Sequence, residues 1–192
     1  MSTTPNQEGQ YQISILYKNQ HIINSPLNLK TQKLIPFTFD TSECNPNITL
    51  SENNLVATLH QGGYASVLGT VEMYQGKHNW KIRIRKINDN SHWMAFGVCK
   101  KPLPNNNVNF NSSYGWSSRN QIHTGNTQAN LPQVSGDWIN GDVIEMTLDC
   151  DNHTLTIKNN RTNKTASMNV PNDSLFPYFN LLNLGNSITL QF

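Results

Sequence analysis

The sequence has little of what usually marks an enzyme, a membrane protein or a disulfide-bonded protein. Its three cysteines are widely separated, odd in number and free of any C-x-x-C pair, which argues against a zinc or redox motif. No apolar run approaches the length of a membrane span, and the N-terminus has no apolar segment like that of a signal peptide. We therefore expect an intracellular, cytoplasmic protein that makes no contact with a membrane.

Reactive motifs are also absent. The sequence contains no G-x-S-x-G, no H-E-x-x-H, no phosphate-binding glycine loop and no G-x-G-x-x-G. The six histidines are scattered without the spacing of metal ligands. Asp142 and Asp149 stand at predicted strand ends, where a carboxylate is more often a turn residue than half of a catalytic pair. We expect no enzyme activity, no metal site and no cofactor.

Charge is scarce and nearly balanced, with 14% charged residues and a net charge of +2. Lys81, Arg83 and Arg85 alternate with Ile82 and Ile84, which places the three cations on one face of a predicted strand. No set of aromatic residues interleaves with these cations, as a nucleic-acid platform would require. We interpret them as a solvated strand face and expect no nucleic-acid partner.

What the sequence does contain is alternation of apolar and polar residues over short runs. In residues 138–160, Ile144, Met146 and Leu148 alternate with polar residues, and the alternation resumes at Leu155 after a tight turn. This period of two is typical of strands with one buried face. No helical periodicity of useful length interrupts the runs. The predicted strands are 37–39, 48–51, 55–60, 67–70, 79–85, 93–99, 115–118, 122–124, 143–149, 154–158, 165–169, 178–181 and 187–192.

These strands predict an all-β fold, a bent two-sheet antiparallel β-sandwich spanning residues 37–192. The Asn-rich stretch 102–113 is predicted to be a long surface loop, where binding residues often lie. The four tryptophans lie at or beside strands, and we expect them to pack mostly in the core. Trp116 is the exception, because it precedes a polar segment that includes Arg119. We expect it to be partly exposed and to act as an interface anchor.

The N-terminal part reads differently. Residues 1–10 are polar and predicted to be disordered, whereas residues 11–32 have the pattern of a β-hairpin with a turn at 18–20. The pattern is carried by Tyr11, Ile13, Ile15, Tyr17, His21, Ile22, Ser25 and Pro26, with Leu27 where phenylalanine is usual. It resembles the last two strands of a filamin-type immunoglobulin repeat, and a generic hairpin is the alternative. Because two strands alone are marginal in water, the hairpin must pack on the main domain, recruit a partner or be the remnant of a larger domain.

Seven short motifs follow one another in a characteristic order after residue 37. They are Val67-Leu68-Gly69, Gly76-Lys77-His78-Asn79-Trp80, Phe96-Gly97-Val98, Tyr114-Gly115-Trp116, Trp138 with Gly141-Asp142-Val143, Leu148-Asp149, and Phe176-Pro177-Tyr178-Phe179. Together they make residues 37–192 resemble a SPRY domain, a bent β-sandwich of concanavalin-like jelly-roll type found in many TRIM ligases and adaptors. Asn79, where an aromatic is frequent, and Thr156-Ile157, where Ser-Phe is common, depart from the family pattern but suit a strand.

The SPRY resemblance implies recognition of a peptide or protein surface by loops at one end of the sandwich. The corresponding loops are residues 61–66, 105–110, 118–120 and 182–185. We expect Tyr64 and Phe110 to form apolar walls, and Arg119 to pair with an acidic or carbonyl group of the ligand. Asn107 and Asn183 are expected to donate further hydrogen bonds. The complete set of expected partner-binding residues is Tyr64, Asn107, Phe110, Trp116, Arg119, Asn120 and Asn183.

The sequence therefore predicts a non-enzymatic protein-interaction module. With the filamin-like hairpin in front, it resembles the C-terminal half of a TRIM-like protein, which implies the substrate-recognition end of a ubiquitin ligase or an adaptor. The alternative from another class is a carbohydrate-binding, lectin-like β-sandwich, for which Asn is plentiful but a clustered Asp-x-Asn calcium pattern is missing. A hydrolase on a similar sandwich would need two carboxylates facing each other across a cleft, and acidic residues are few.

Overall fold

The period of two in the sequence is reproduced residue by residue in the strands. In β9 (Lys77–Lys86), Ile82 and Ile84 are buried, whereas Lys81, Arg83 and Arg85 are exposed. In β14 (Val143–Asp149) the burial alternates in the same way, with Ile144, Met146 and Leu148 inside. Each strand thus presents one apolar face, and two such faces must be brought together to be hidden from water.

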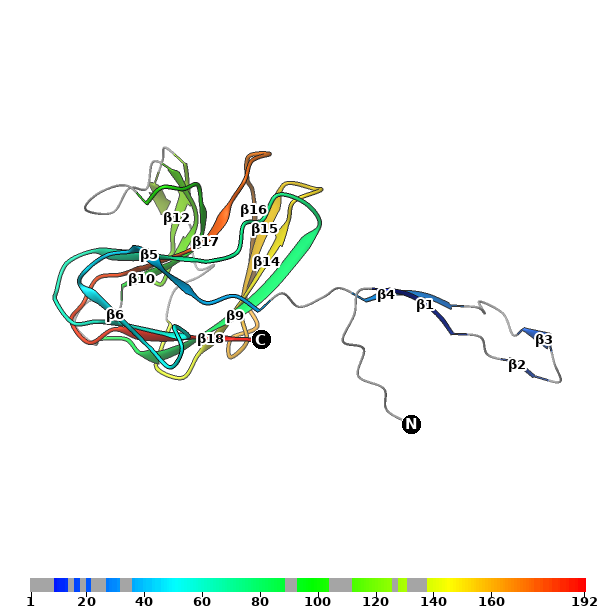
Figure 1. Cartoon of the computed structure of the whole chain (residues 1–192), viewed down its shortest axis with the longest axis horizontal. Coiled ribbons are helices and arrows are strands. Elements are labelled where there is room, and N and C mark those ends of the chain that lie inside the picture. The colour runs from blue at the N-terminus through cyan, green and yellow to red at the C-terminus, as the bar shows by residue number, and fades with distance from the viewer. Residues whose placement is uncertain are drawn as a thin grey trace. The chain divides into compact units, whose positions relative to one another are not determined.

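The computed structural model describes residues 36–88, 93–103, 112–125 and 138–192 in full, and 9–13, 16–17, 20–21, 27–31 and 128–130 as strands only. The chain divides into two units, residues 1–35 and residues 36–192. Figure 1 labels strands of each unit.

The first layer of the larger unit, sheet I, contains seven strands in the order β13-β12-β11-β10-β17-β8-β5, all paired antiparallel. Its central strand, β10, is buried along its whole length. The strands of sheet I are β5 (Phe39–Cys44), β8 (Ala65–Gly69), β10 (Met94–Cys99), β11 (Ser113–Ser117), β12 (Gln121–Thr124), β13 (Gln128–Asn130) and β17 (Phe176–Leu181).

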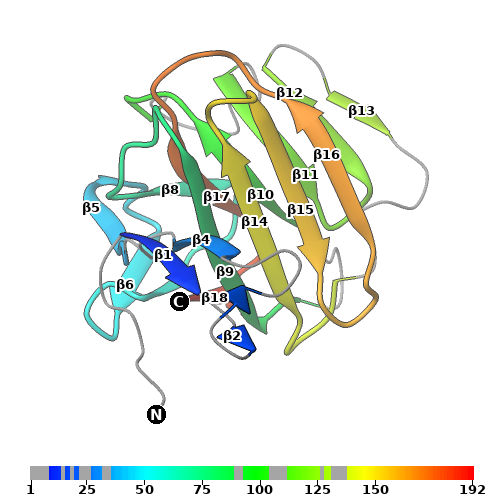
Figure 2. The same cartoon turned by 90° about the vertical axis from the view of Figure 1, so that its right-hand side faces the viewer.

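The second layer, sheet II, also has seven antiparallel strands, in the order β16-β15-β14-β9-β18-β7-β6. Figure 2 looks onto this sheet, with β16, β15, β14 and β9 side by side and strands of sheet I behind them. Besides β9 and β14 it contains β6 (Ile48–Ser51), β7 (Val56–Leu59), β15 (Thr154–Asn159), β16 (Thr165–Asn169) and β18 (Ser187–Gln191).

The core lies between the two sheets and is rich in aromatic rings. Phe96 of β10 stacks on Trp138 with ring centroids 4.8 Å apart, and Phe39 meets Phe179 edge-on at 5.1 Å. Trp80 of sheet II is buried in the same cluster. All four tryptophans are buried, which confirms the prediction that they belong mostly to the core. Rings of this size contribute much of the apolar area that holds the layers together.

The N-terminal unit is a nested pair of short antiparallel ladders. The strand β1 (Gly9–Ile13) pairs with β4 (Leu27–Thr31), and β2 (Leu16–Tyr17) pairs with β3 (Gln20–His21). Tyr17 and Gln20 are register partners, so the chain reverses between them, where the sequence predicted a turn. The first strand begins at Gly9, two residues before the start expected for the hairpin.

The all-β, two-sheet antiparallel sandwich predicted from the sequence is confirmed. Most predicted strands match an observed one to within a few residues. The predicted strand 37–39 matches less well, because β5 begins at Phe39 and runs to Cys44, and the observed strand β13 was not predicted at all. No α-helix occurs in the described part of the chain, and none of its elements is a helix that could cross a membrane.

Candidate functional site: the loops at one end of the sandwich

Three of the loops singled out in the sequence meet at the same end of sheet I. The register pairs Met94 with Leu181, Leu181 with Ala65, and Ala95 with Ser117. These partners lie at the start of β8 and β10 and at the end of β11 and β17. The loops attached at those points, residues 60–64, 118–120 and 182–186, are therefore neighbours in space, and we call them the end loops.

Direct contacts tie the first and third end loops together. The Gly63 N–H donates to the carbonyl of Leu182 at 3.1 Å, and the Gly185 N–H donates at 2.8 Å to the carbonyl of Leu59, the last residue of β7 before the first end loop. Gly63 and Gly185 both have positive φ angles, which favour glycine. The loops leave two apolar side chains in contact with water, Tyr64 at 36% exposure and Leu184 at 58%.

Trp93 contacts two of the end loops, through Tyr64 and Asn186. The ring of Tyr64 meets it edge-on, with the centroids 5.0 Å apart. Its indole Nε1 donates to Gln121 Oε1 at 2.9 Å, and its carbonyl accepts from Asn186 Nδ2 at 3.2 Å. Because Trp93 itself is buried, it positions Tyr64 rather than offering a surface of its own. The sequence predicted only that Trp93 packs in the core. Its position at the start of a strand and next to polar loops is the signal that could have indicated its role in positioning Tyr64.

Arg119 is held at the tip of a tight turn between β11 and β12. The turn is fixed to β10 by two hydrogen bonds, from the Ser118 N–H to the Met94 carbonyl at 2.8 Å and from the Met94 N–H to Ser118 Oγ at 3.0 Å. Asn120 follows with a φ of +59°, a left-handed conformation that asparagine tolerates well. Arg119 is exposed, and the residue before it in the turn is thus anchored to β10.

Asn183 takes part in a turn of the third end loop. Its carbonyl accepts from the Asn186 N–H at 2.9 Å, and the Asn186 side chain also accepts from the Asn88 N–H at 2.9 Å. The predicted residues Tyr64, Arg119, Asn120 and Asn183 therefore all belong to the end loops. Leu184, Trp93 and Asn186 belong to the same assembly, and the sequence did not single them out.

The expected exposure of Trp116 is wrong. Its side chain is only 1% exposed, and it lies in the core cluster. The reason is the register, which pairs Trp116 with Phe96 on one side and with Ile122 on the other, so that all three lie on the inward face of sheet I. A buried ring can stiffen β11 beneath the Arg119 turn, but it cannot anchor a partner directly.

The strand ends that flank the predicted loop 105–110 are not at the end of sheet I where the other three loops meet. Asn107 and Phe110 lie outside the described residues. The flanking strands are β10, which ends at Cys99, and β11, which begins at Ser113. These two residues are register partners, and they lie at the end of sheet I opposite to Met94 and Ser117. The described residues therefore bring three of the four predicted loops together, whereas the strands that flank the fourth end at the other end of the sheet.

The end loops carry side chains suited to binding. Residues 60–64, 118–120 and 182–186 contain a tyrosine ring, a guanidinium, amides, two leucines and the imidazole of His60, but no carboxylate or thiol. Elsewhere, burial raises the pKa of Cys44 and Cys150 to about 11 and that of Cys99 to about 12. These thiols are protonated at neutral pH and therefore weak nucleophiles. Among the described residues, no group of three or more His, Cys, Asp or Glu side chains could hold a metal ion.

The basic face of β9 is largely neutralised by its neighbours. Lys81 pairs with Glu145 at 3.1 Å and Arg85 with Glu52 at 2.5 Å. Lys77, on the same face, pairs with Asp149 at 3.2 Å. Such exposed pairs add little stability, but they offset the positive charge of the strand and agree with its interpretation as a solvated face.

The part of the chain that contains most of the sandwich matches a known domain family. The model of the SPRY domain family matches residues 77–192, more than half of the chain. The chain belongs to the SPRY domain family. SPRY domains are protein-interaction modules, so the end loops lie on a fold whose family role is binding.

Solved structures show the same fold at low sequence identity. The SPRY domain of human HERC1 matches with a TM-score of 0.67 and 20% identity, covering 79% of this chain and 96% of that one. The TRIM65 PSpry domain matches with a TM-score of 0.64 and 19% identity, covering 81% and 92%. Stonustoxin matches with a TM-score of 0.62 and 16% identity, covering 81% of this chain but 27% of that one. These likenesses support the SPRY sandwich and carry no information about the ligand.

Proposed function

We propose that this SPRY domain recognises a peptide or protein surface through its three end loops, with Tyr64 and Arg119 as the main contacts. The observation that carries the proposal is that an exposed aromatic ring and an exposed arginine lie in loops at the same end of sheet I. Tyr64 is partly exposed and packs edge-on against Trp93, and Arg119 is an exposed residue of a turn that is hydrogen-bonded to β10. Aromatic rings and arginines in such braced positions are typical interface hot spots.

The charge of the end loops indicates the character of the ligand. With His60 counted as neutral, Arg119 is the only charged residue in the end loops. A guanidinium forms its strongest hydrogen bonds with carboxylates or with paired carbonyl groups. The favoured ligand is therefore a segment that presents an acidic side chain or exposed carbonyls beside an apolar residue, which packs on Tyr64 and Leu184.

The proposed site is tested by affinity capture from extracts of the source cells, with quantitative comparison of the unmodified chain and its variants. Tyr64→Ala and Arg119→Ala are expected to lose the same partner, with losses of about 2 kcal/mol or more in binding free energy for a hot spot. Tyr74→Ala is the matched control, because it removes an exposed tyrosine that lies outside the three end loops. Retention of every partner by both end-loop variants would reject the site, and calcium-dependent binding on a glycan array would favour the lectin alternative instead.

We also propose that the chain serves as the substrate-recognition end of a TRIM-like ubiquitin ligase or an adaptor, and that the N-terminal hairpin derives from a filamin-type repeat. The support is the hairpin pattern together with its antiparallel register, which places positions 11, 13, 27 and 29 on one face of the strand pair. In the sequence these positions are Tyr, Ile, Leu and Leu, and the alternate positions are polar.

The sequence of the transcript upstream of Met1 tests this second proposal. A RING, B-box or coiled coil, or the earlier strands of a filamin repeat, would support it. An upstream region that encodes none of these would contradict it, and would leave the binding role of the end loops untouched.

A further inference from the structure

Strand β16, residues Thr165–Asn169, forms one outer edge of sheet II. Figure 2 shows it at the margin of the sheet, next to β15. In the described chain no strand pairs with its other side. An unpaired edge presents a row of backbone N–H and C=O groups that can pair with another extended chain. The groups on the open side of β16 therefore decide what this edge can bind.

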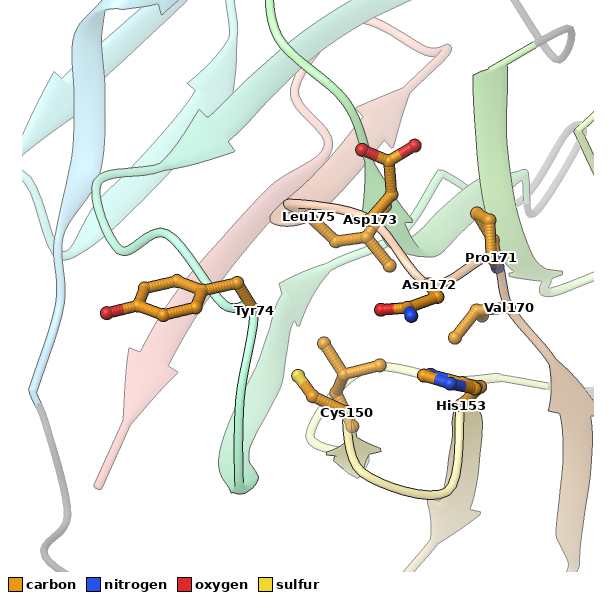
Figure 3. A pocket seen from close by; sticks show the side chains of 9 residues that line it. Tyr74, Cys150, His153, Val170, Pro171, Asn172, Asp173 and Leu175 are labelled. Carbon is orange, nitrogen blue, oxygen red and sulfur yellow. The ribbon is translucent and has the colours of Figure 1, made fainter.

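Two hydrogen bonds mark the ends of the ladder that joins β15 and β16. The Asn159 N–H donates to the Lys164 carbonyl at 3.0 Å, and the Val170 N–H donates to the His153 carbonyl at 2.9 Å. Figure 3 shows the second of these ends, where Val170 lies beside His153 and is followed by Pro171. Because hydrogen-bonded and non-bonded pairs alternate along antiparallel strands, these two bonds fix the phase of the whole ladder.

The outward backbone groups of β16 belong to three residues. The even-numbered residues from 164 to 170 turn their N–H and C=O toward β15, whereas Thr165, Ser167 and Asn169 turn theirs away from it. The side chains of these three residues are exposed, while Met168 is buried and Ala166 is half-buried. An incoming strand would thus meet free backbone groups, small polar side chains on the outer face of the sheet and apolar side chains on the inner face.

The β16 edge lacks the features that usually keep strand edges from pairing, which are bulges, prolines, charged side chains, short length or a covering segment. Its sequence is Thr-Ala-Ser-Met-Asn, and its register with β15 is uninterrupted. By contrast, the edge strand β5 has an irregular register and carries Asp40 and Glu43, and β13 spans only three residues. In β6 the N–H of Ile48 donates to the Asn45 carbonyl at 2.9 Å. Of these four edges in the described chain, β16 alone is open along its length.

Strand β16 is complementary to a second copy of itself. An antiparallel pair with its two-fold axis at Ser167 places Thr165 opposite Asn169 of the partner subunit. These pairs and the central serine pair can each exchange two backbone hydrogen bonds. On the inner face, the short Ala166 lies opposite the long Met168 of the partner subunit. The two Lys164 side chains are separated by about 20 Å along the strands, beyond the screening length of about 8 Å, so like charges do not meet.

From this complementarity we propose that the domain forms a two-fold symmetric dimer through antiparallel pairing of β16 with β16 of a second copy. The pairing extends sheet II across both copies, and it closes at two because the axis uses the same edge of each. The axis also reverses the direction of every strand. The two sets of end loops therefore face opposite ways, and the dimer can hold two partner chains at once.

Sedimentation equilibrium of the full chain, from low micromolar to near-millimolar concentration, tests the dimer. One strand pair is a small interface, so we expect a weak dimer that appears as a rise in mass with concentration. Ser167→Lys and Ser167→Glu each place like charges opposite one another at the axis and should weaken dimerisation about fivefold or more. A mixture of the two variants should recover dimerisation, because opposite charges then meet at the axis.

Two further variants separate pairing at this edge from other causes of association. Ser167→Pro removes an outward N–H without removing a hydrogen bond of the β15–β16 ladder, and it should also weaken the dimer. Thr49→Lys is the control, because it adds the same charge to an exposed residue at the opposite edge of sheet II and should leave the dimer unchanged. Urea midpoints show that each variant is folded.

Three results would overturn the proposal. They are a mass that stays monomeric at every concentration, a dimer that the two charged Ser167 variants leave intact, and a mixture of these variants that does not recover dimerisation. None of these results depends on whether the end loops bind the partner proposed for them.

Discussion

Gly97 and Gly115 face each other across β10 and β11, and neither position has room for a β-carbon. An atom added at Gly97 would lie 1.9 Å from the carbonyl oxygen of Tyr114, and one added at Gly115 would lie 2.2 Å from that of Phe96. Both obstacles are backbone atoms, which cannot move aside without parting the strands. These glycines are needed for the close approach of the chain, and the turn that carries Arg119 depends on that approach.

Gly97→Ala or Gly115→Ala is therefore expected to destabilise the domain by about 2–3 kcal/mol or more, as overpacking of a filled interior does. Gly62→Ala is the control, because nothing lies within 4 Å of its added carbon and its φ is not in the left-handed region. Urea unfolding measures the difference. Equal urea midpoints for Gly97→Ala, Gly115→Ala and Gly62→Ala would show that β10 and β11 can accommodate a β-carbon at the glycine pair.

At the scale of elements, the hairpin β14–β15 is fastened at its open end by a buried carboxylate. Asp142, just before β14, is 3% exposed and accepts hydrogen bonds from Arg161 Nε at 2.6 Å and Arg161 Nη2 at 3.1 Å. It also accepts from Asn159 Nδ2 at 2.8 Å and from the Ile139 N–H at 3.2 Å. The last bond confirms the turn role predicted for Asp142. Arg161 was not foreseen, because it follows the partner strand and only the hairpin pairing brings it near.

Arg161→Ala should cost about 3 kcal/mol of unfolding free energy, because it leaves a buried carboxylate without its cation. Arg83→Ala removes an exposed arginine and should change stability by about 0.5 kcal/mol at most. Burial by itself would raise the pKa of Asp142, but the hydrogen bonds from Arg161 and Asn159 hold it below the usual value. The Asp142–Arg161 pair therefore contributes its full share of the unfolding free energy above pH 3.8, the ordinary pKa of an aspartate. This contribution is lost as the pH falls through the lower pKa that Asp142 has in the folded state. Similar losses of unfolding free energy in Arg161→Ala and Arg83→Ala would contradict the stabilising role of the pair.

For the molecule as a whole, acid sensitivity should begin above the range in which carboxylates titrate. His123 of β12 is 2% exposed, and burial lowers its pKa from 6.5 to about 4. The folded state keeps this imidazole neutral, while the unfolded chain takes up a proton below pH 6.5. Stability is therefore full above that pH and declines as the pH falls toward 4.

A decline of up to about 3 kcal/mol is expected from this histidine, at 1.36 kcal/mol per pKa unit. His123→Gln replaces the imidazole with a neutral amide and should flatten the loss of stability between pH 6.5 and pH 4. His60→Gln, which changes an exposed histidine, provides the control for the exchange of an imidazole for an amide. Chemical denaturation at several pH values checks both variants, and a slope that persists in His123→Gln would assign the acid sensitivity to other groups.

Much of the architecture could be read from the chain itself, because the period of two is a local property. The alternation around Ile82, Ile84 and Met146 identified the strands and their inward faces, and the ordered motifs identified the SPRY resemblance that the family match confirms. The composition also showed that the end loops contain amides, an arginine and a tyrosine but no reactive pair. These conclusions need no knowledge of which strands are neighbours.

The arrangement of the site was decided only by the tertiary structure, because it depends on pairings between residues far apart in the sequence. Register brings Leu181 beside Met94 and Ala65, and so joins three loops around the buried Trp93. The same register turns Trp116 into the core, against the expectation that it would be exposed, and sends the strand ends of the 105–110 loop to the other end of the sheet. Local alternation states which face of a strand is apolar, but only the pairing of strands decides which loops share an end.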